Sequence, residues 1–340
     1  MRPPELGGPA EIEATAALEE GRVIGGKYRI EKVIGQGGMG VVHAARHIER
    51  DELVAIKVLR PVMMSLPGMV ARFLREGRAA RAIESEHVAR VSEVDTLPSG
   101  VPYMVMEHLD GTDLAALRRA QGQIPIADAA GYIAQACDGI AEAHALGIVH
   151  RDLKPANLFL AQREGRASTI KVLDFGISKV DGPGEQDMTK PGMTMGSPKY
   201  VSPEQMKSMH DADDRSDIWA LGAILYELLA GRPAFLADDI REVCALVLHA
   251  DPPPLRSFRP DVPPELEAIV TRCLRKQPQQ RFASAIDLAG ALSPFASSSL
   301  KPRARPRAPG TAPPSRVRAL LVAALAVVIA LGIAALVLAR

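Results

Sequence analysis

Five polar side chains lie within the stretch His150–Asn157 (HRDLKPAN), which is bracketed by apolar residues. A proline inside this stretch excludes a continuous helix, so we expect a loop held rigid by its ends, the usual place for catalytic groups. Asp152 could accept or orient a hydroxyl proton, and Lys154 could neutralise a transferring phosphoryl group. Asn157 could ligate a metal through its amide oxygen.

A carboxylate follows shortly after this loop. Asp174 stands at the end of the apolar run Lys171-Val172-Leu173, where a short strand is expected. Magnesium takes hard oxygen ligands, often one or two carboxylate or amide groups together with phosphates and water. Asp174 with Asn157 meets that requirement.

Glycines are concentrated in the stretch 35–40 (GQGGMG), where a turn could approach phosphates closely and expose backbone N–H groups. The pattern alone is weak evidence, since turn glycines and dinucleotide-binding folds also show it. Residues 28–34 alternate as a strand, and the residues after Gly40 are β-branched and alternating. We therefore expect a strand–loop–strand hairpin and not the strand–helix turn of a dinucleotide site.

Lys57 ends the apolar stretch Val54-Ala55-Ile56, and a buried ammonium needs anionic partners. Phosphates and a carboxylate would supply them. The segment 72–81 is predicted to form an amphipathic helix with Glu76 on its inward side, between Phe73 and Ala80. Taken alone, Glu76 is one charge among many on a basic helix. Only its occurrence together with the other motifs makes it a candidate partner of Lys57.

The ordered set of motifs resembles the protein kinase signature over residues 28–292. The parts are the glycine loop with Val42, VAIK at Lys57, Glu76, HRDLKPAN, DFG at Asp174, and Ser202-Pro203-Glu204 where the family has APE. The motif GQGGMGVV and the segment Asp217–Gly222 are most similar to those of bacterial Hanks-type Ser/Thr kinases. Lys154 is typical of the Ser/Thr group, so the resemblance implies phosphorylation of Ser and Thr hydroxyls in protein substrates.

The resemblance also implies roles for individual residues. Lys57 would hold the α- and β-phosphates of ATP and pair with Glu76, while Asp152 and Lys154 would act at the acceptor hydroxyl and the γ-phosphate. Asn157 and Asp174 would hold Mg²⁺, or Mn²⁺ in its place. The expected nucleotide pocket consists of Ile34, Gly35, Gln36, Gly37, Gly38, Met39, Gly40, Val42, Ala55, Lys57, Met106, Glu107, Leu109 and Phe159. Within it, Met106 fits the gatekeeper position, and the backbone of 107–109 would read the adenine edge.

Regulation can be outlined in the same way. Arg151 directly precedes Asp152, an arrangement in which a phosphate on the activation loop pairs with a basic pocket and orders the loop. Thr189 and Thr194 are the candidate phosphosites, and the resemblance implies autophosphorylation of this loop. Glu204 would pair with Arg281 and brace the larger lobe. We assign no role to histidines other than His150.

The expected fold is α+β: a two-lobed kinase with a small β-rich lobe and a larger, mainly helical lobe. We predict a flexible tail (1–27), a small lobe (28–106), a hinge (107–111) and a large lobe (112–292).

The chain has 41 basic and 40 acidic side chains, a formal charge of +1, so nothing in its overall charge indicates binding to nucleic acid. Its three cysteines lack CxxC spacing, which argues against a zinc site or a disulfide framework. The N-terminus has no apolar secretory segment.

The segments after residue 292 differ in composition. Residues 293–318 are rich in Pro, Ser and Arg and contain no acidic residue, and residues 319–339 contain no charge. At helical rise, 319–339 would span roughly 31 Å, about the thickness of the hydrocarbon core, so we predict a transmembrane helix. Basic residues precede it, namely Lys301, Arg303, Arg305, Arg307, Arg316 and Arg318. The positive-inside bias then predicts a cytoplasmic kinase domain held by a C-terminal, single-pass anchor in the cell membrane.

Of two other readings, the scaffold keeps little weight and the oxidoreductase fails. A pseudokinase would use the same fold as a membrane-held scaffold, but the residues expected to be catalytic are all present. A dinucleotide-binding oxidoreductase would need an acidic ribose-binding residue where VAIK stands. Gly332 in the predicted membrane helix would permit close helix packing and homodimerisation, although a single small residue is weak support.

Overall fold

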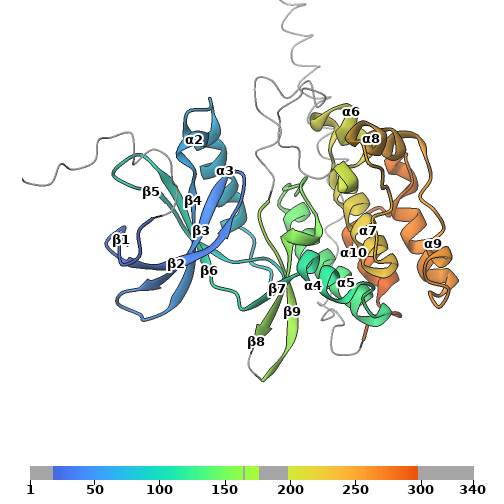
Figure 1. Cartoon of the computed structure of the whole chain (residues 1–340), viewed down its shortest axis with the longest axis horizontal. Coiled ribbons are helices and arrows are strands. Elements are labelled where there is room, and N and C mark those ends of the chain that lie inside the picture. Colours follow the sequence, from blue (N-terminus) through green and yellow to red (C-terminus); the bar gives the residue numbers. More distant parts are fainter. Residues whose placement is uncertain (1–17, 164, 176–197, 298–340) are drawn as a thin grey trace, which may run out of the picture. The chain divides into compact units, whose positions relative to one another are not determined.

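The computed structural model describes residues 18–163, 165–175 and 198–297. Among them, the N-terminal lobe contains a six-stranded antiparallel sheet with the strand order β1-β2-β3-β4-β6-β5. Two helices connect β4 to β5, and the second, α3, packs against β5 and β6 (Figure 1). The elements of this lobe are β1 (Val23–Ile24), β2 (Tyr28–Gln36), β3 (Gly40–His47), β4 (Leu53–Leu59), α2 (Pro61–Met64), α3 (Met69–Arg81), β5 (Val91–Thr96) and β6 (Pro102–Glu107).

The glycine-rich stretch joins two paired strands, so the predicted strand–loop–strand hairpin is confirmed. Strands β2 and β3 pair up to Gln36 and Val41, and the Gly37 N–H donates to the Gly40 carbonyl at 2.9 Å. A Cβ on Gly40 would stand 2.6 Å from the carbonyl oxygen of Val58, so only glycine allows β3 to lie this close to β4 there. A helix could not follow the glycines in this geometry, which excludes the dinucleotide-binding turn.

Helix α3 turns its apolar side toward the sheet, as its periodicity predicts. Phe73, Glu76 and Ala80 are buried, and a Cβ on Gly77 would stand 2.8 Å from a methyl carbon of Val94 on β5. Because Gly77 has no side chain, the helix backbone approaches the sheet closely at the turn that carries Glu76. The inward position predicted for Glu76 is confirmed.

The C-terminal lobe is mainly helical and carries a three-stranded antiparallel sheet, β7-β8-β9. Its α-helices are α4 (Leu114–Gln121), α5 (Ile126–Ala145), α6 (Pro203–Lys207), α7 (Asp214–Ala230), α8 (Ile240–His249), α9 (Pro264–Cys273) and α10 (Ala285–Leu292). Its strands are β7 (Gly111–Asp113), β8 (Leu158–Arg163) and β9 (Arg166–Val172). Short 3₁₀ turns are η1 (Pro155–Asn157), η3 (Pro198–Tyr200), η4 (Met209–Asp211), η5 (Leu255–Ser257) and η6 (Pro278–Gln280).

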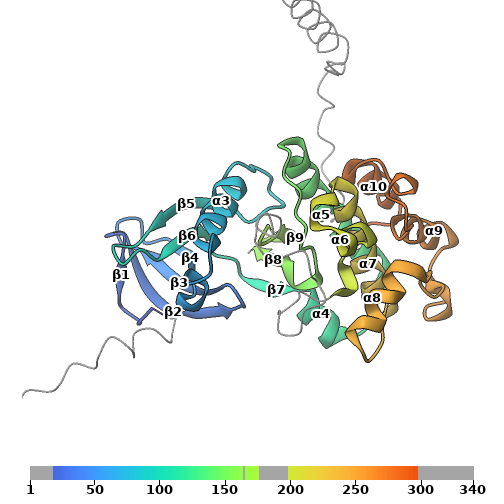
Figure 2. The ribbon, with the colours of Figure 1, turned by 90° about the horizontal axis from the view of Figure 1, so that it is seen from above.

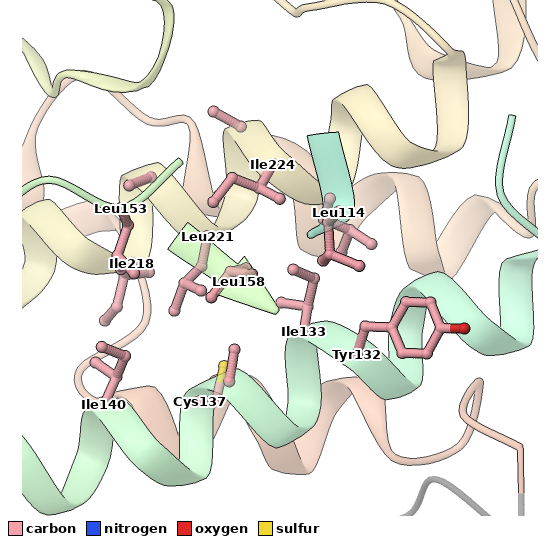
Figure 3. Close-up of a cluster of buried hydrophobic side chains, with 14 of the residues drawn as sticks. Leu114, Tyr132, Ile133, Cys137, Ile140, Leu153, Leu158, Ile218, Leu221 and Ile224 are labelled. Atoms are coloured by element: carbon pink, nitrogen blue, oxygen red, sulfur yellow. The ribbon is translucent and has the colours of Figure 1, made fainter. Parts of the chain in front are cut away.

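Helices α5 and α7 form the centre of this lobe. Every residue of α7 from Ser216 to Ala230 is buried, so this helix is covered on all sides and needs no polar face. Figure 3 shows Ile133 and Ile140 of α5 pointing toward Ile218 and Leu221 of α7, with Leu158 of β8 between the helices. The strand that follows the HRDLKPAN loop is therefore packed onto the most buried part of the lobe.

The segment after α3 ties β9 to the rest of the fold. The Val172 N–H donates to the His87 carbonyl at 2.8 Å, and the Ala89 N–H donates to the Val172 carbonyl at 3.0 Å. On the other side of this segment, a Cβ on Gly139 of α5 would stand 2.8 Å from the same His87 oxygen. In the view of Figure 2, β8 and β9 lie between the N-terminal sheet and the helices of the larger lobe. The chain leading to Asp174 is thus held from both lobes.

Part of the predicted tail 1–27 takes part in the fold ahead of Tyr28. Val23–Ile24 pairs with β2, Ile24 is buried, and the Leu18 N–H donates to Nε2 of His43 at 3.0 Å. The two-residue strand is too short to show periodicity in the sequence. At the other end, α10 stops at Leu292 as predicted, although Ala296 beyond it is still buried.

No helix within 18–163, 165–175 and 198–297 has both the length and the apolar character needed to cross a membrane. The predicted transmembrane segment 319–339 and the phosphosite candidates Thr189 and Thr194 lie outside the described residues.

The predicted pair of Glu204 and Arg281 is confirmed as a buried, bidentate ion pair. Arg281 donates to the two carboxylate oxygens of Glu204 at 2.7 and 2.8 Å, and also to the carbonyls of Arg275, Arg215 and Lys276. Burial alone would raise the pKa of Glu204, but the guanidinium outweighs it and lowers that pKa. The pair joins the start of α6 to the segment between α9 and α10.

Arg281→Leu is expected to lower the free energy of unfolding by about 3–5 kcal/mol, because it leaves the Glu204 carboxylate and three carbonyls without their charged donor. Urea unfolding followed by circular dichroism measures this loss. Arg275→Gln is the matched control, since Arg275 is exposed and contributes only its backbone carbonyl. Equal losses in the two variants would contradict a specific role for the buried pair.

Candidate active site

Lys57 lies in the middle of β4 and contacts the other lobe directly. Its Nζ donates to Oδ1 of Asp174 at 2.6 Å, although 117 positions separate the two residues. Burial alone would lower the pKa of Lys57, but the carboxylates of Asp174 and Glu76 outweigh it and raise the pKa. The resemblance implied a pair with Glu76. In the structure, Glu76 is buried on α3, and its carboxylate is one of the charges that raise the pKa of Lys57.

Asp174 follows β9 and has a left-handed backbone conformation, with φ at 48°. Such a conformation is uncommon for a residue other than glycine and persists only where the surroundings enforce it. The next residue, Phe175, is buried and packs on the His150 ring at 4.7 Å between centroids. His150 in turn meets the Leu173 carbonyl through Nε2 at 2.9 Å. The pKa of Asp174 is lowered, since the effect of Lys57 exceeds that of burial.

The predicted catalytic loop is closed by its own side chains. Lys154 donates to Oδ2 of Asp152 at 2.8 Å, and Nδ2 of Asn157 donates to the Asp152 carbonyl at 2.8 Å. The Leu173 N–H donates to the Asn157 carbonyl at 2.8 Å, which links the loop to the strand that presents Asp174. The structure therefore brings Asp152, Lys154 and Asn157 together, as the sequence predicts.

One buried carboxylate positions this loop. Asp217 of α7 is 1% exposed and accepts hydrogen bonds from the backbone N–H groups of His150 and Arg151 at 2.8 and 2.9 Å. Arg151 has a positive φ of 64°, so the loop is strained at the residue that Asp217 holds. Sequence reasoning noted Asp217 only as part of a motif and gave it no role.

His144, to which sequence reasoning gave no role, completes this arrangement. Its Nε2 lies 2.8 Å from Oδ2 of Asp217. Burial alone would lower the pKa of His144, but the bond to Asp217 and the carboxylate charges around it raise the pKa. A histidine six residues before HRD, at the end of an apolar helix, was a signal that could have been followed.

The expected adenine-side residues share one face of the N-terminal sheet. Val42 pairs in register with Lys57, and Ala55 pairs with Met106. Directly opposite residues of antiparallel strands, and residues two apart on one strand, point to the same face. Val42, Ala55, Lys57 and Met106 therefore line one surface. Phe159 lies on β8, in the other sheet.

The start of the predicted hinge is held by two contacts. The Glu107 N–H donates to the Arg90 carbonyl at 2.9 Å, so this donor is engaged within the protein. The Glu107 side chain accepts from the buried ammonium of Lys171 at 2.6 Å. This ion pair joins the hinge to β9, and nothing in the sequence pattern indicated it.

The residues present fit ATP and a divalent cation. The amide nitrogen of Asn157 is bonded to the loop, which leaves its oxygen to ligate a metal beside the Asp174 carboxylate. When bound, Mg²⁺ supplies charge neutralisation for the phosphates. A Cβ on Gly38 would meet no atom within 4 Å, so the tip of the glycine loop is open to a ligand. Lys57 would hold phosphate oxygens, Asp152 would take or orient the hydroxyl proton, and Lys154 would stabilise the transferred group.

The raised pKa of His144 predicts a pH dependence of stability. Below the ordinary histidine pKa of 6.5 the folded and unfolded chains are both protonated there, so the charged bond to Asp217 contributes fully. The contribution falls as pH rises through the raised pKa of the folded state. Wild type should exceed His144→Asn by about 1.5–3 kcal/mol in unfolding free energy below pH 6.5, with a smaller margin at higher pH.

Urea unfolding at a series of pH values measures this margin. Taking the difference between wild type and variant cancels the opposite contribution of His150, whose pKa is lowered by burial. His210→Asn, at an exposed histidine, is the matched control and should show no such trend. A margin independent of pH would contradict the charged bond.

The chain is similar in sequence to known protein kinases. The family described as "Protein kinase domain" matches residues 28–289. The chain is 39% identical to the Ser/Thr-protein kinase Pkn1 of Myxococcus xanthus over 84% of its own length and 40% of that protein. It is 36% identical to the Ser/Thr-protein kinase PknB of Mycolicibacterium smegmatis over 77% of its length and 42% of that protein.

Among solved structures, the PknI kinase domain of Mycobacterium tuberculosis matches with a TM-score of 0.65 and 27% identity. That match covers 82% of this chain and all of the PknI domain. The chain spans less than half the length of the curated relatives it matches. The fold, the set of site residues and these likenesses agree, and the chain belongs to the protein kinase family, beside Ser/Thr kinases of bacteria.

Proposed function

We propose that this chain is an ATP- and Mg²⁺-dependent protein kinase that transfers the γ-phosphate to Ser and Thr hydroxyls of proteins. The observation that carries the proposal is the convergence of Lys57, Asp152, Lys154, Asn157 and Asp174 through short hydrogen bonds. These residues come from three separate segments, and only their joint placement suits phosphoryl transfer.

The complete set also weighs against a pure scaffold. A pseudokinase has no need for a buried ammonium held in its charged form, yet Asp174 and Glu76 raise the pKa of Lys57 here. Keeping this charge in a buried site has a cost unless a ligand or mechanism uses it. An active enzyme explains the arrangement better.

The activation loop is the proposed point of control, with autophosphorylation at Thr189 or Thr194. Support comes from Arg151, whose buried Nε has no hydrogen-bond partner in the part of the chain that the structure describes. A guanidinium of this kind can receive a phosphate through charge-assisted bonds. The phosphorylated loop would then be ordered against the catalytic loop.

A membrane tether is the second part of the proposal. The uncharged segment 319–339 would cross the bilayer once, and the basic residues before it would stay on the cytoplasmic side with the kinase domain. Gly332 would allow two such helices to pack closely in a homodimer.

Incubating the full chain in detergent with labelled ATP and Mg²⁺ tests the activity. Label on Thr189 or Thr194 is expected, together with transfer to Ser and Thr of added protein. Asp174→Ala should abolish both, because a metal ligand is lost. Asp152→Asn should lower kcat by about 10²–10⁴-fold with little change in KM for ATP.

The exposed carboxylate of Asp211 provides the matched control, and Asp211→Asn should behave as wild type. Nucleotide binding without any transfer, or equal label in wild type and Asp174→Ala, would contradict the kinase activity and favour a binding scaffold.

Vesicle flotation tests the tether. Full chain mixed with vesicles of neutral and anionic phospholipid should float with them even at about 1 M NaCl, because burial of apolar surface is not screened by salt. A chain lacking 319–339 should float only at low salt, through its basic residues. Release of the full chain by salt would refute a spanning helix.

A further inference from the structure

A pocket of about 270 Å³ lies beside the catalytic loop, and the preceding assignments do not use it. Four parts of the larger lobe build it: Ala115 and Arg118 of α4, Lys154–Ala156 of the loop, Lys199 and Tyr200 of η3, and Glu227 of α7, with Pro233. Lys154 links the pocket to the reaction centre, since its Nζ lies 2.8 Å from Asp152.

The pocket is lined by more positive than negative side chains. Three cations, Arg118, Lys154 and Lys199, face a single carboxylate, that of Glu227. Both oxygens of Glu227 are already engaged. Arg118 reaches Oε1 at 3.0 Å, the Tyr200 hydroxyl donates to Oε2, and the Glu227 side chain is only 3% exposed. A basic side chain entering the pocket would therefore meet no available carboxylate there.

An acidic side chain would meet one unpaired cation. Lys199 forms no ion pair with any residue in the described ranges, whereas the charge of Arg118 is already matched by Glu227 and its Nε is buried. The walls around them are small or apolar, namely Ala115, Pro155, Ala156 and Pro233, so a short side chain can enter without losing a polar partner. Charge complementarity favours a carboxylate.

The position of the pocket relative to the acceptor follows from chain geometry. An extended peptide advances about 3.3 Å per residue, and Lys154 borders both the pocket and Asp152. A residue within one to three positions of the acceptor Ser or Thr can reach the pocket.

We propose that this pocket selects protein substrates with an Asp or Glu within three residues of the acceptor hydroxyl, through Lys199, while Arg118 neutralises Glu227. The proposal rests on the kinase activity proposed above and names the substrate class of that site. Arg118 acts by occupying the Glu227 carboxylate, which keeps Glu227 from attracting a basic side chain.

The experiment uses the full chain and a set of peptides with one Thr acceptor, in which each neighbouring position is Ala, Glu or Arg in turn. For wild type, kcat/KM should be about 5–10-fold higher for Glu than for Ala at one of these positions, chiefly through KM, and lower for Arg. Lys199→Gln should remove most of the preference for Glu while leaving kcat on the Ala peptide unchanged.

Arg118→Gln is the sharper variant, because it frees the Glu227 carboxylate. It should shift the preference from Glu toward Arg, which loss of structure alone would not do. Arg119→Gln, at the exposed neighbouring arginine of α4, is the matched control and should keep the wild-type preference. If Arg118→Gln fails to fold, Lys199→Gln still decides the question.

The outcomes separate this proposal from the kinase activity. Transfer to the Ala peptide with no preference among Glu, Ala and Arg, or with a preference for Arg, overturns the pocket assignment and leaves the kinase intact. A preference for Glu that survives in both Lys199→Gln and Arg118→Gln also overturns it. Absence of transfer to every peptide and to added protein would instead refute the proposed function.

Discussion

The geometry of the site depends on the burial of Asp217 at the start of α7. Its carboxylate receives two backbone N–H groups of the catalytic loop and the ring of His144, in surroundings almost free of water. Hydrogen bonds to a charged group are stronger there than in water, and they offset the unfavourable conformation of Arg151, which is of order 1–3 kcal/mol. Because α7 is buried on all sides, it can hold this carboxylate rigidly. The loop that carries Asp152, Lys154 and Asn157 is thereby fixed to the core of the lobe.

A second constraint acts across the lobes. Lys57 is carried by the N-terminal sheet and Asp174 by the chain after β9, and their contact requires both supports to be in place. The segment 87–89 provides one, since it bonds to Val172 and lies against α5. The ion pair of Glu107 and Lys171 provides another link, from the end of β6 to β9. Buried charges of this kind contribute little net stability but define one arrangement among many, since alternatives leave a charge unpaired.

A buried charge pair also determines the character of the pocket beside the catalytic loop. Glu227 is almost fully buried, yet its charge is matched by Arg118 and by the Tyr200 hydroxyl. The Arg118 side chain thus determines which sign of charge the pocket presents. The shared catalytic residues do not dictate this choice, because Arg118 and Lys199 lie outside the motifs that identify the family.

The sequence by itself determined the family, the order of the elements and the candidate catalytic groups. Glycines, a buried lysine, a proline-interrupted polar loop and a carboxylate after an apolar strand each have a local physical meaning, and their order along the chain adds to it. The inward face of α3 and the hairpin around Gly37 followed from such local reasoning, whereas the pair of Glu204 and Arg281 was implied by the family resemblance.

Tertiary structure decided what depends on distant pairing. The partner of the Lys57 hydrogen bond, the role of His144 under the catalytic loop and the link from Glu107 to Lys171 all join residues far apart in the chain. The strand Val23–Ile24 pairs nearby, with Tyr28 and Arg29, but it is too short to show a pattern in the sequence. A charge or a two-residue strand carries no information about its partner until the chain is folded. Burial then determines whether that partner is water or another residue.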